Sequence, residues 1–243
     1  MKKITQEELR QHCRHGTWRV LEQRAIAITS LAEKAANSVM RPLLGGGTRL
    51  MLAIEHRISD DIDLFIDTPQ WLGFLTPRMN DDIEEMVDTY QDGLTSLRFG
   101  FPEGEIDYIV GMSLLGLPPE VLPESAFELE PVAEVLAKKL FYRGDRLTPR
   151  DLFDWRMVEE CVPEQQLHIE KIANALRDKF DGIAQALNTI GGIAPENYQW
   201  NSIRTPYELG LQETLEWAQT RLEYYKTLAT RKNQGSASKP RTA

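Results

Sequence analysis

The sequence predicts an α+β fold, with a small mixed β-sheet core flanked by N-terminal helices and a C-terminal helical region. Apolar residues recur at helical spacing in the first 39 residues and again beyond residue 131. Between these segments lie short runs rich in Ile, Leu, Val and Phe, among them 62–66 and 105–110, which are typical of strands. The order of helices, strands and helices favours an α+β fold over one of alternating βα units.

The composition indicates an ordinary globular protein, with 243 residues, 42% of them hydrophobic and 27% charged. No apolar run approaches the roughly 20 residues that span a bilayer, and the first residues lack a secretory signal, so we expect a cytoplasmic location without membrane contact. The two cysteines, Cys13 and Cys161, lie far apart in sequence and are expected to be free thiols. The net charge of −9 disfavours nucleic-acid binding by overall charge alone but leaves room for a local basic groove.

Four parts are expected along the chain. Residues 1–39 form N-terminal helices that pack on the core, and residues 40–130 form the catalytic core. Residues 131–230 form a helical region that completes the active site. Residues 231–243 are basic and poor in apolar residues, which predicts a disordered tail.

The first half of the chain has its expected elements in this order. Thr5 followed by Glu8 has the form of a capping box and begins one or two helices over residues 5–37. Residues 40–44 suit a short strand, in which Pro42 indicates either an edge position or a late start. Three glycines end this strand, and residues 48–56 return to helical spacing. A strand over 61–66 follows.

In the second half, a short helix is expected to end near Tyr90, followed by a hairpin of 94–101 with 105–110. Residues 111–130 are rich in Gly, Pro and Leu and are expected to connect across the sheet. Helices are then expected over 132–143, 148–160, 163–187 and 206–229, with a loop over 190–201.

Asp61 and Asp63 are candidate metal ligands, because side chains two residues apart on a strand share one face. Two neighbouring carboxylates repel each other unless a cation lies between them, and a divalent metal often serves. Asp107 lies in a later apolar strand, where a charge without compensation is costly, and it is a candidate third ligand. A surface D-x-D pair at the start of a strand is the alternative.

A candidate phosphate site precedes these carboxylates, because the backbone N–H groups of a glycine turn at a helix N-terminus can cradle phosphate. The turn spans Gly45-Gly46-Gly47-Thr48 and lacks the G-K-[ST] of a P-loop. Thr48 is expected either to hydrogen-bond a phosphate or to cap the helix. Arg57 and Ser59 are surface loop residues on one interpretation. On the other, Arg57 pairs with an acid and Ser59 orients Asp61.

Lys139 lies on the apolar stripe of its helix and Lys138 lies off it, so Lys139 is expected to point inward towards an anion. That anion is either a triphosphate or a carboxylate of Asp151 or Asp154. Asp151 also fits a capping box that begins at Thr148, with Pro at the first helical position.

The strings GGGTRLMLAIEHRISDDIDLF and AKKLFYRGDRLTPRDLFDW carry a resemblance to a known family. They resemble the AbiE-type (AbiEii and MenT-like) nucleotidyltransferase toxins of the DNA polymerase β-like nucleotidyltransferase superfamily. The resemblance covers residues 43–158, and its His-Arg-x-Ser-x-Asp-Ile-Asp string is the most specific part. It implies that Asp61 and Asp63 bind metal, that Gly46, Gly47 and Thr48 contact the triphosphate, and that Lys139 and Asp151 complete the pocket.

The expected reaction is transfer of an NMP from an NTP to an acceptor, with Mg²⁺ or Mn²⁺ and release of pyrophosphate. The resemblance implies an RNA acceptor, with a tRNA 3′ end as one form of it, and a cognate antitoxin protein as partner. Transfer to a small molecule such as an aminoglycoside is one alternative, and a non-catalytic relative that binds a nucleotide or a partner is another.

Overall fold

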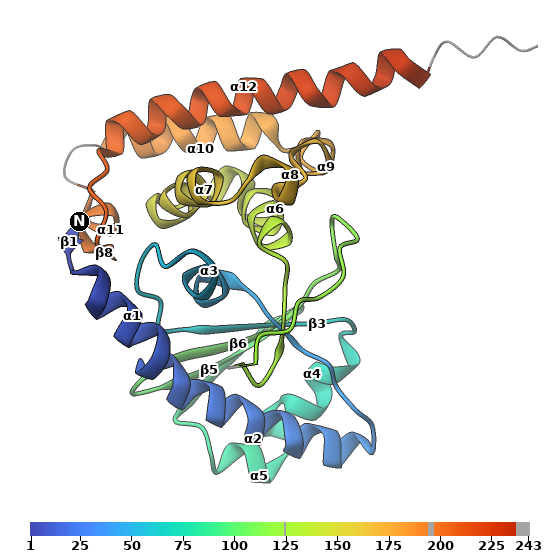
Figure 1. The fold of residues 1–243 in the computed structure, drawn as a ribbon. Coiled ribbons are helices and arrows are strands. Elements are labelled where there is room, and N and C mark those ends of the chain that lie inside the picture. The colour runs from blue at the N-terminus through green and yellow to red at the C-terminus, as the bar shows by residue number, and fades with distance from the viewer. Residues whose placement is uncertain (124, 194–196, 237–243) are drawn as a thin grey trace, which may run out of the picture. The chain divides into compact units, whose positions relative to one another are not determined.

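The computed structural model describes residues 1–123, 125–193 and 197–236, and Figure 1 shows their arrangement. The chain forms two compact units. One unit comprises Ile4–Pro131 together with Arg204–Pro206 and is called the sheet unit here. The other comprises Met1–Lys3, Val132–Ile203 and the described chain from Tyr207, and is called the helical unit. In the described ranges, no helix has both the length and the apolar character that crossing a bilayer would require.

The sheet unit contains a six-stranded sheet with the strand order β4-β5-β6-β3-β2-β7. Two neighbouring pairs, β3 with β6 and β2 with β7, are parallel, and the other pairs are antiparallel. The sheet is therefore mixed, and the predicted α+β class is confirmed. The strands are β2 (Leu43–Leu44), β3 (Ile62–Ile66), β4 (Thr89–Asp92), β5 (Ser96–Phe101), β6 (Gly104–Val110) and β7 (Glu128–Leu129). A further two-residue strand of this unit is β8 (Arg204–Thr205).

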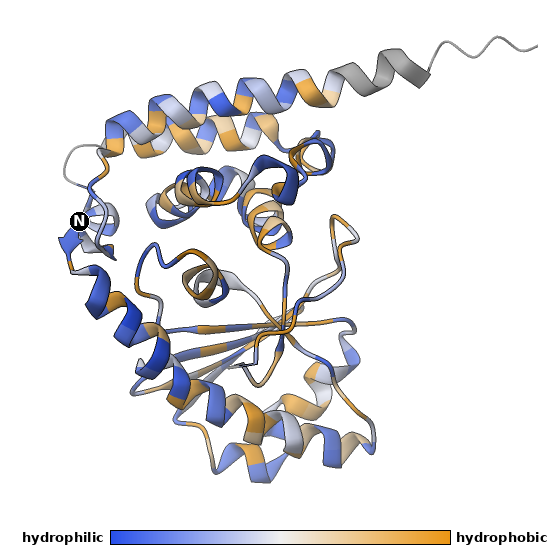
Figure 2. Ribbon diagram, in the orientation of Figure 1, coloured by the Kyte–Doolittle hydropathy of each residue, from blue (hydrophilic) through white to orange (hydrophobic). Residues whose placement is uncertain are grey.

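The first helix of the sheet unit begins where the local sequence predicts. Thr5 and Glu8 form the expected capping box, and the helix that follows is hydrophilic along most of its length (Figure 2), with Leu9 as its fully buried residue. The next helix buries a stripe against the sheet that includes Leu21, Ala25 and Ile28. The helices are α1 (Gln6–His15), α2 (Trp18–Ala36), α3 (Gly46–Ile54), α4 (Gln70–Leu75), the 3-10 helix η1 (Pro77–Met79) and α5 (Asp81–Glu84).

The two faces of β3 differ as the sequence predicts. Ile62 and Leu64 are fully buried, whereas Asp63 is only half-buried. Tyr108 pairs with Leu64 in the parallel register, and its hydroxyl donates to the carbonyl of Ala25 on α2. The apolar face of β3 therefore packs towards α2, and Asp63 lies on the opposite face, on which α3 lies (Figure 1).

Some expected elements of the sheet unit are corrected by the structure. The helix expected to end near Tyr90 is wrong, because α5 ends at Glu84 and Thr89–Asp92 is the strand β4, paired with β5. Pro42 reflects a late start, since β2 lies between β3 and β7 and begins only at Leu43. The two cysteines are free thiols, as expected.

The helical unit begins with α6 over the residues predicted, and its second helix starts at the predicted Pro149. The single helix expected over 163–187 is wrong, because His168 has a left-handed φ of 51° and ends the first short segment. The helices are α6 (Val132–Arg143), the 3-10 helix η2 (Gly144–Arg146), α7 (Pro149–Cys161), α8 (Glu164–Leu167), α9 (Ile169–Ala175), α10 (Phe180–Ile193), α11 (Tyr198–Ser202) and α12 (Leu211–Ser236). A two-residue strand, β1 (Lys2–Lys3), also belongs to this unit.

The C-terminal boundaries also differ from those expected. The loop over 190–201 is wrong in part, because α10 continues to Ile193 and α11 begins at Tyr198; residues 194–196 lie outside the described ranges. The helix α12 continues to Ser236, so the expected disordered tail from 231 is helical for its first part. Residues 237–243 lie outside the described ranges.

Candidate active site

The glycine turn before α3 holds the carboxylate of Asp63. The backbone N–H of Gly45 donates to the carbonyl oxygen of Asp63 over 2.9 Å. Gly46 has a φ of +62°, and a β-carbon there would lie 1.7 Å from Oδ2 of Asp63. Only glycine combines this backbone conformation with so close an approach. The turn and the strand carboxylate are therefore packed into a single site.

Arg57 and Ser59 lie on the other side of the same turn. A β-carbon on Gly47 would lie 2.7 Å from Oγ of Ser59 and 2.8 Å from Nη2 of Arg57. Both side chains are buried, and Nη1 of Arg57 donates to the carbonyl of Ile58 over 3.1 Å. The interpretation of these two residues as surface loop residues is therefore wrong. The structure places a guanidinium and a hydroxyl beside the turn predicted to bind phosphate.

One of the two roles predicted for Thr48 is wrong, and the other stays a prediction. Helix α3 has Gly45 as its N-cap and no side-chain cap, so Thr48 is not the cap. Its hydroxyl is fully buried and donates to the backbone carbonyl of Asp61. The hydroxyl proton is thus engaged with Asp61 in this structure, and the contact of Thr48 with a triphosphate stays a prediction. Thr48 instead ties α3 to the residue that precedes β3.

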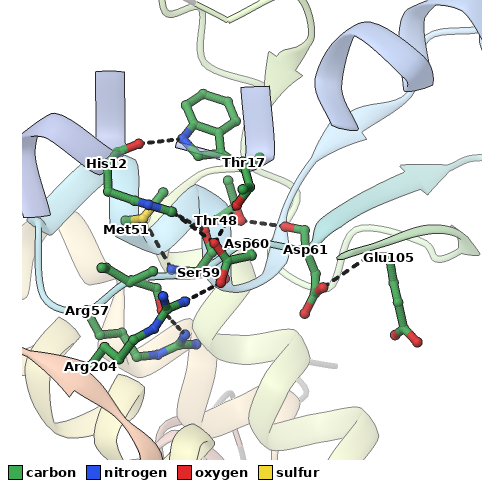
Figure 3. A network of polar contacts seen from close by, with 12 residues as sticks. His12, Thr17, Thr48, Met51, Arg57, Ser59, Asp60, Asp61, Glu105 and Arg204 are labelled. Atoms are coloured by element: carbon green, nitrogen blue, oxygen red, sulfur yellow. Dashed lines mark hydrogen bonds and ion pairs between the residues drawn. The ribbon is translucent and has the colours of Figure 1, made fainter. Parts of the chain in front are cut away.

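Asp61 precedes β3 and lies at the exposed end of the site. Its Oδ1 accepts the backbone N–H of Glu105 at the start of β6 over 3.1 Å (Figure 3). The carboxylate is thereby oriented by the strand that carries Asp107. The sequence puts Asp61 and Asp63 on one face of a strand, but only Asp63 lies within β3 itself.

Asp107 is the register partner of Asp63 across the parallel strands β3 and β6. Both of its carboxylate oxygens accept from Arg98 on β5, over 2.8 Å each, and Nη1 of Arg98 lies 3.0 Å from Glu105. These hydrogen bonds to Asp107 raise the pKa of Arg98 above its ordinary value, with the charges of Asp107, Glu105 and Asp63 adding to the effect against the opposing cost of burial. Sequence reasoning missed Arg98, although the hairpin predicted over 94–110 contains the signal for it.

The donor set on this face suits a hard divalent cation. Asp63 and Asp107 are aligned on neighbouring strands, which lie about 4.8 Å apart in a sheet, and carboxylate oxygens are the ligands that Mg²⁺ prefers. The close fit of Asp63 against Gly46 fixes one of these donors. Among the described residues, no three or more His, Cys, Asp and Glu side chains are grouped so that they could hold a metal. The metal-binding role of Asp61, Asp63 and Asp107 therefore stays a prediction.

Asp60 is the centre of a polar network behind the site (Figure 3). Its carboxylate accepts from the hydroxyl of Thr17 over 2.6 Å, lies 3.2 Å from Nε2 of His12 and pairs with Arg204. Burial alone would raise the pKa of Asp60, but these three partners outweigh it and hold the pKa well below its usual range. The network fixes the residue directly before Asp61. In the sequence, a polar connection is the only sign of this network.

The segment Arg204–Pro206 fastens the same loop from a distant part of the chain. The backbone N–H of Ile58 donates to the carbonyl of Arg204 over 2.9 Å, and the hydroxyl of Thr205 donates to the carbonyl of His56 over 2.6 Å. His56 is fully buried. The loop that carries Arg57, Ser59 and Asp60 is therefore held at both ends.

Lys139 and Asp151 meet in the helical unit. Nζ of Lys139 lies 3.1 Å from Oδ1 of Asp151 and 3.1 Å from Oδ2 of Asp154, and the Lys139 side chain is 12% exposed. Asp151 also forms the predicted capping box with Thr148 and pairs with Arg143 over 3.2 Å. Burial would raise the pKa of Asp151, but Lys139 and Arg143, with the hydrogen bond from Thr148, outweigh it and hold the pKa below its usual value.

Two sequence predictions about this cluster have different outcomes. Lys139 points inward to an anion, and the anion is a pair of aspartates, one of the two alternatives predicted. The expectation that Lys138 lies off the buried face is wrong, because Lys138 is only 5% exposed. The remaining predicted residues, Gly46, Gly47, Thr48, Arg57, Ser59, Asp61, Asp63 and Asp107, all belong to the sheet unit.

A known protein family matches most of this chain. The family model described as "Nucleotidyl transferase AbiEii toxin, Type IV TA system" covers residues 31–230, well over half of the sequence. No curated protein matches the chain.

Solved structures that are similar to this chain include the following three, all at low identity. One is JHP933 from Helicobacter pylori, with 15% identity and a TM-score of 0.47 over 89% of this chain and 94% of that chain. Another is a putative nucleotidyltransferase from H. pylori, with 13% identity and a TM-score of 0.49 over 87% and 96%. A third is the antibiotic-resistance factor ANT(2'')-Ia, with 15% identity and a TM-score of 0.44 over 68% and 95%.

Proposed function

This chain belongs to the AbiEii nucleotidyltransferase family, and we propose that it transfers an NMP from an NTP to an RNA acceptor with the help of a divalent metal ion. The observation that carries the proposal is the packing of Asp63 against Gly46. It brings a strand carboxylate within reach of the backbone at a helix N-terminus. A metal held by carboxylates and a triphosphate held by N–H groups need these two features side by side.

The triphosphate is assigned to the turn at the start of α3. The first N–H groups of a helix have no partner within the helix, and they carry the positive end of its dipole. Gly46 and Gly47 leave this backbone without side chains, and the buried guanidinium of Arg57 lies beside it. These features support phosphate binding without a Walker lysine. Thr48 and Ser59 are also assigned to the nucleotide site: the hydroxyl of Thr48 ties α3 to the loop before β3, and Ser59 lies beside Gly47.

The metal, Mg²⁺ or Mn²⁺, is assigned to Asp61 and Asp63, with Asp107 as a third ligand. Such an ion supplies Lewis-acid stabilisation of the charge that develops on the transferred phosphoryl group. Asp63 is held by the turn, and Asp61 is oriented by the N–H of Glu105. Asp107 is also proposed to help deprotonate the acceptor hydroxyl. The nucleotide-binding roles of Lys139 and Asp151 stay part of the proposal.

The acceptor and the biological role are proposals that rest on the family. The description of the family includes a type IV TA system, which supports a toxin whose partner is a cognate antitoxin. An RNA acceptor, with a tRNA 3′ end favoured, and a cytoplasmic site of action complete the proposal. An aminoglycoside-like acceptor is the second candidate, because the chain is acidic overall and a cationic small molecule suits an acidic surface.

The experiment is incubation with each α-labelled NTP, Mg²⁺ and total RNA, with Asp63→Asn as the site variant. Asp67→Asn is the matched control, since Asp67 is an exposed carboxylate just beyond the other end of β3. We expect label in RNA for the wild type and for Asp67→Asn, and its loss for Asp63→Asn and in EDTA. Label that survives Asp63→Asn would remove the site assignment. Label in an aminoglycoside but not in RNA would select the second acceptor class.

The toxin role has a separate test. Expression of the wild-type chain should arrest growth of the host cell, and expression of Asp63→Asn should not. Growth arrest of equal strength by Asp63→Asn would show that toxicity does not depend on nucleotide transfer.

A further inference from the structure

Arg98 donates hydrogen bonds to the carboxylate of Asp107, the candidate third metal ligand. On the antiparallel strands β5 and β6, Arg98 and Asp107 are register partners, and two hydrogen bonds of 2.8 Å join the guanidinium to the two carboxylate oxygens. This two-pronged geometry is the strongest that arginine and a carboxylate adopt. The oxygen atoms that would face a metal ion are thus already engaged by a cation of the protein.

The surroundings of Arg98 allow its guanidinium to move away from Asp107. Its side chain is 44% exposed, whereas that of Asp107 is 14% exposed, so the guanidinium is the partner with more access to solvent. Glu105 lies 3.0 Å from Nη1 of Arg98 and is 47% exposed. Glu105 and Asp107 lie two residues apart on β6 and share one face of the strand. A guanidinium released by Asp107 therefore has an acidic partner next to it.

We propose that Arg98 is a resident cation that competes with a divalent metal ion for the carboxylate of Asp107. With Arg98 in place, the metal relies on Asp61 and Asp63; when Arg98 shifts to Glu105, Asp107 completes the ligand set. The inference rests on the metal-dependent function proposed above. It makes Arg98 a positioning residue that sets the affinity of the site for metal.

The test measures binding of Mn²⁺ in the absence of nucleotide, from the electron paramagnetic resonance signal of the free ion. Arg98→Gln should bind Mn²⁺ about threefold to fivefold more tightly than the wild type, the range expected when a half-exposed ion pair no longer competes. Arg98→Lys keeps the charge and loses the two-pronged geometry, so its affinity should lie between those two. The control is Arg78→Gln, which removes an equal charge from the exposed ion pair with Asp92 and should bind as the wild type does.

A second variant separates release of the ligand from a general charge effect. Adding Asp107→Asn to Arg98→Gln removes the freed carboxylate and should abolish the gain in affinity. Equal Mn²⁺ affinity for the wild type and Arg98→Gln would overturn the inference. So would an Arg98→Lys affinity equal to that of the wild type, because charge alone would then explain the gain.

Failure of the proposed function gives a different pattern. In that case neither the wild type nor Arg98→Gln binds Mn²⁺, or Asp63→Asn leaves binding unchanged. If the wild type binds Mn²⁺ through Asp63 and Arg98→Gln does not differ from it, the metal site stands and only the role of Arg98 falls.

Discussion

The carboxylate of Asp63 lies against the backbone of Gly46, so closely that a β-carbon on Gly46 would be 1.7 Å from Oδ2 of Asp63. The contact joins the two features that the sequence offers, a glycine turn and a pair of aspartates. Because Gly46 also has a φ of +62°, the residue is required for its backbone as well as for its small size. A methyl group added at this position therefore requires the side chain of Asp63 to shift.

Gly46→Ala is expected to lower the rate of nucleotide transfer about 100-fold. The left-handed conformation costs an alanine about 1–2 kcal/mol, and Asp63 must move to make room. A shift of about 1 Å at a catalytic group can lower the rate about 100-fold. The measurements are the rate of label transfer and the thermal midpoint. Gly73→Ala on α4 is the control, because a β-carbon there meets nothing within 4 Å; a fully active Gly46→Ala would contradict the assignment of the turn.

Thr48→Val should destabilise the protein by about 1–3 kcal/mol, the cost of leaving a buried hydrogen-bonding group without its partner. The hydroxyl of Thr48 donates to the carbonyl of Asp61, and valine keeps the shape but not the donor. Thr48→Ser keeps the hydroxyl and should lose less. Urea unfolding measures both. Equal stabilities of the two variants would show that the hydrogen bond to Asp61 does not stabilise the protein.

Asp60 and Arg204 should be coupled in a double-mutant cycle of Asp60→Asn and Arg204→Gln. Their side chains are 30% and 42% exposed, so the coupling free energy in unfolding should be small, about 0.5–1 kcal/mol. The effect on kcat/KM should be larger than the effect on stability, because Asp60 precedes Asp61. The exposed pair Glu223 and Lys226 on α12 is the control and should leave transfer unchanged. Independent effects of the two site changes on transfer would contradict this role.

Lys139→Met should lower the free energy of unfolding by about 3–5 kcal/mol, because it removes the cation that the buried carboxylates of Asp151 and Asp154 share. Asp151 is 2% exposed and Asp154 is fully buried. Arg143→Gln removes a second cation from Asp151, but the Arg143 side chain is 52% exposed and the loss should be about 1 kcal/mol or less. Chemical unfolding at neutral pH measures both. A Lys139→Met protein of unchanged stability that has lost transfer would assign Lys139 to the nucleotide alone.

The lowered pKa of Asp151 predicts how the free energy of unfolding changes at acidic pH. Burial opposes its ionisation, but Lys139 and Arg143 hold its pKa in the folded protein below its usual value. Its contribution to stability is therefore fully present above the unfolded pKa of about 3.9, and it is lost as the pH falls through the lower folded pKa. The difference in unfolding free energy between the wild type and Asp151→Asn should shrink over that acidic range. A difference that stays constant from pH 7 into this range would contradict the ion pairing.

Much of the local structure follows from the sequence because its causes are local. The capping boxes at Thr5 and Thr148, the start of α6 and the alternating faces of β3 depend on residues only a few positions apart. The prediction of a single helix over 163–187 is wrong, by contrast, because spacing alone does not determine backbone conformation. Its apolar spacing is helical throughout, but His168 adopts a left-handed conformation that spacing does not reveal.

The sequence by itself determined the family string, the glycine turn and the two aspartates, and so the class of reaction. Tertiary structure alone decided which side chains pair with the aspartates of the site. The sequence predicts the hairpin of β5 and β6, but Arg98 faces Asp107 because the observed loop contains only the two residues between these strands, and this loop sets their register. Arg204 reaches Asp60 across 144 residues of chain. Such partners are chosen by chain topology, and because no local pattern encodes topology, the charges that surround a carboxylate become visible only in the folded protein.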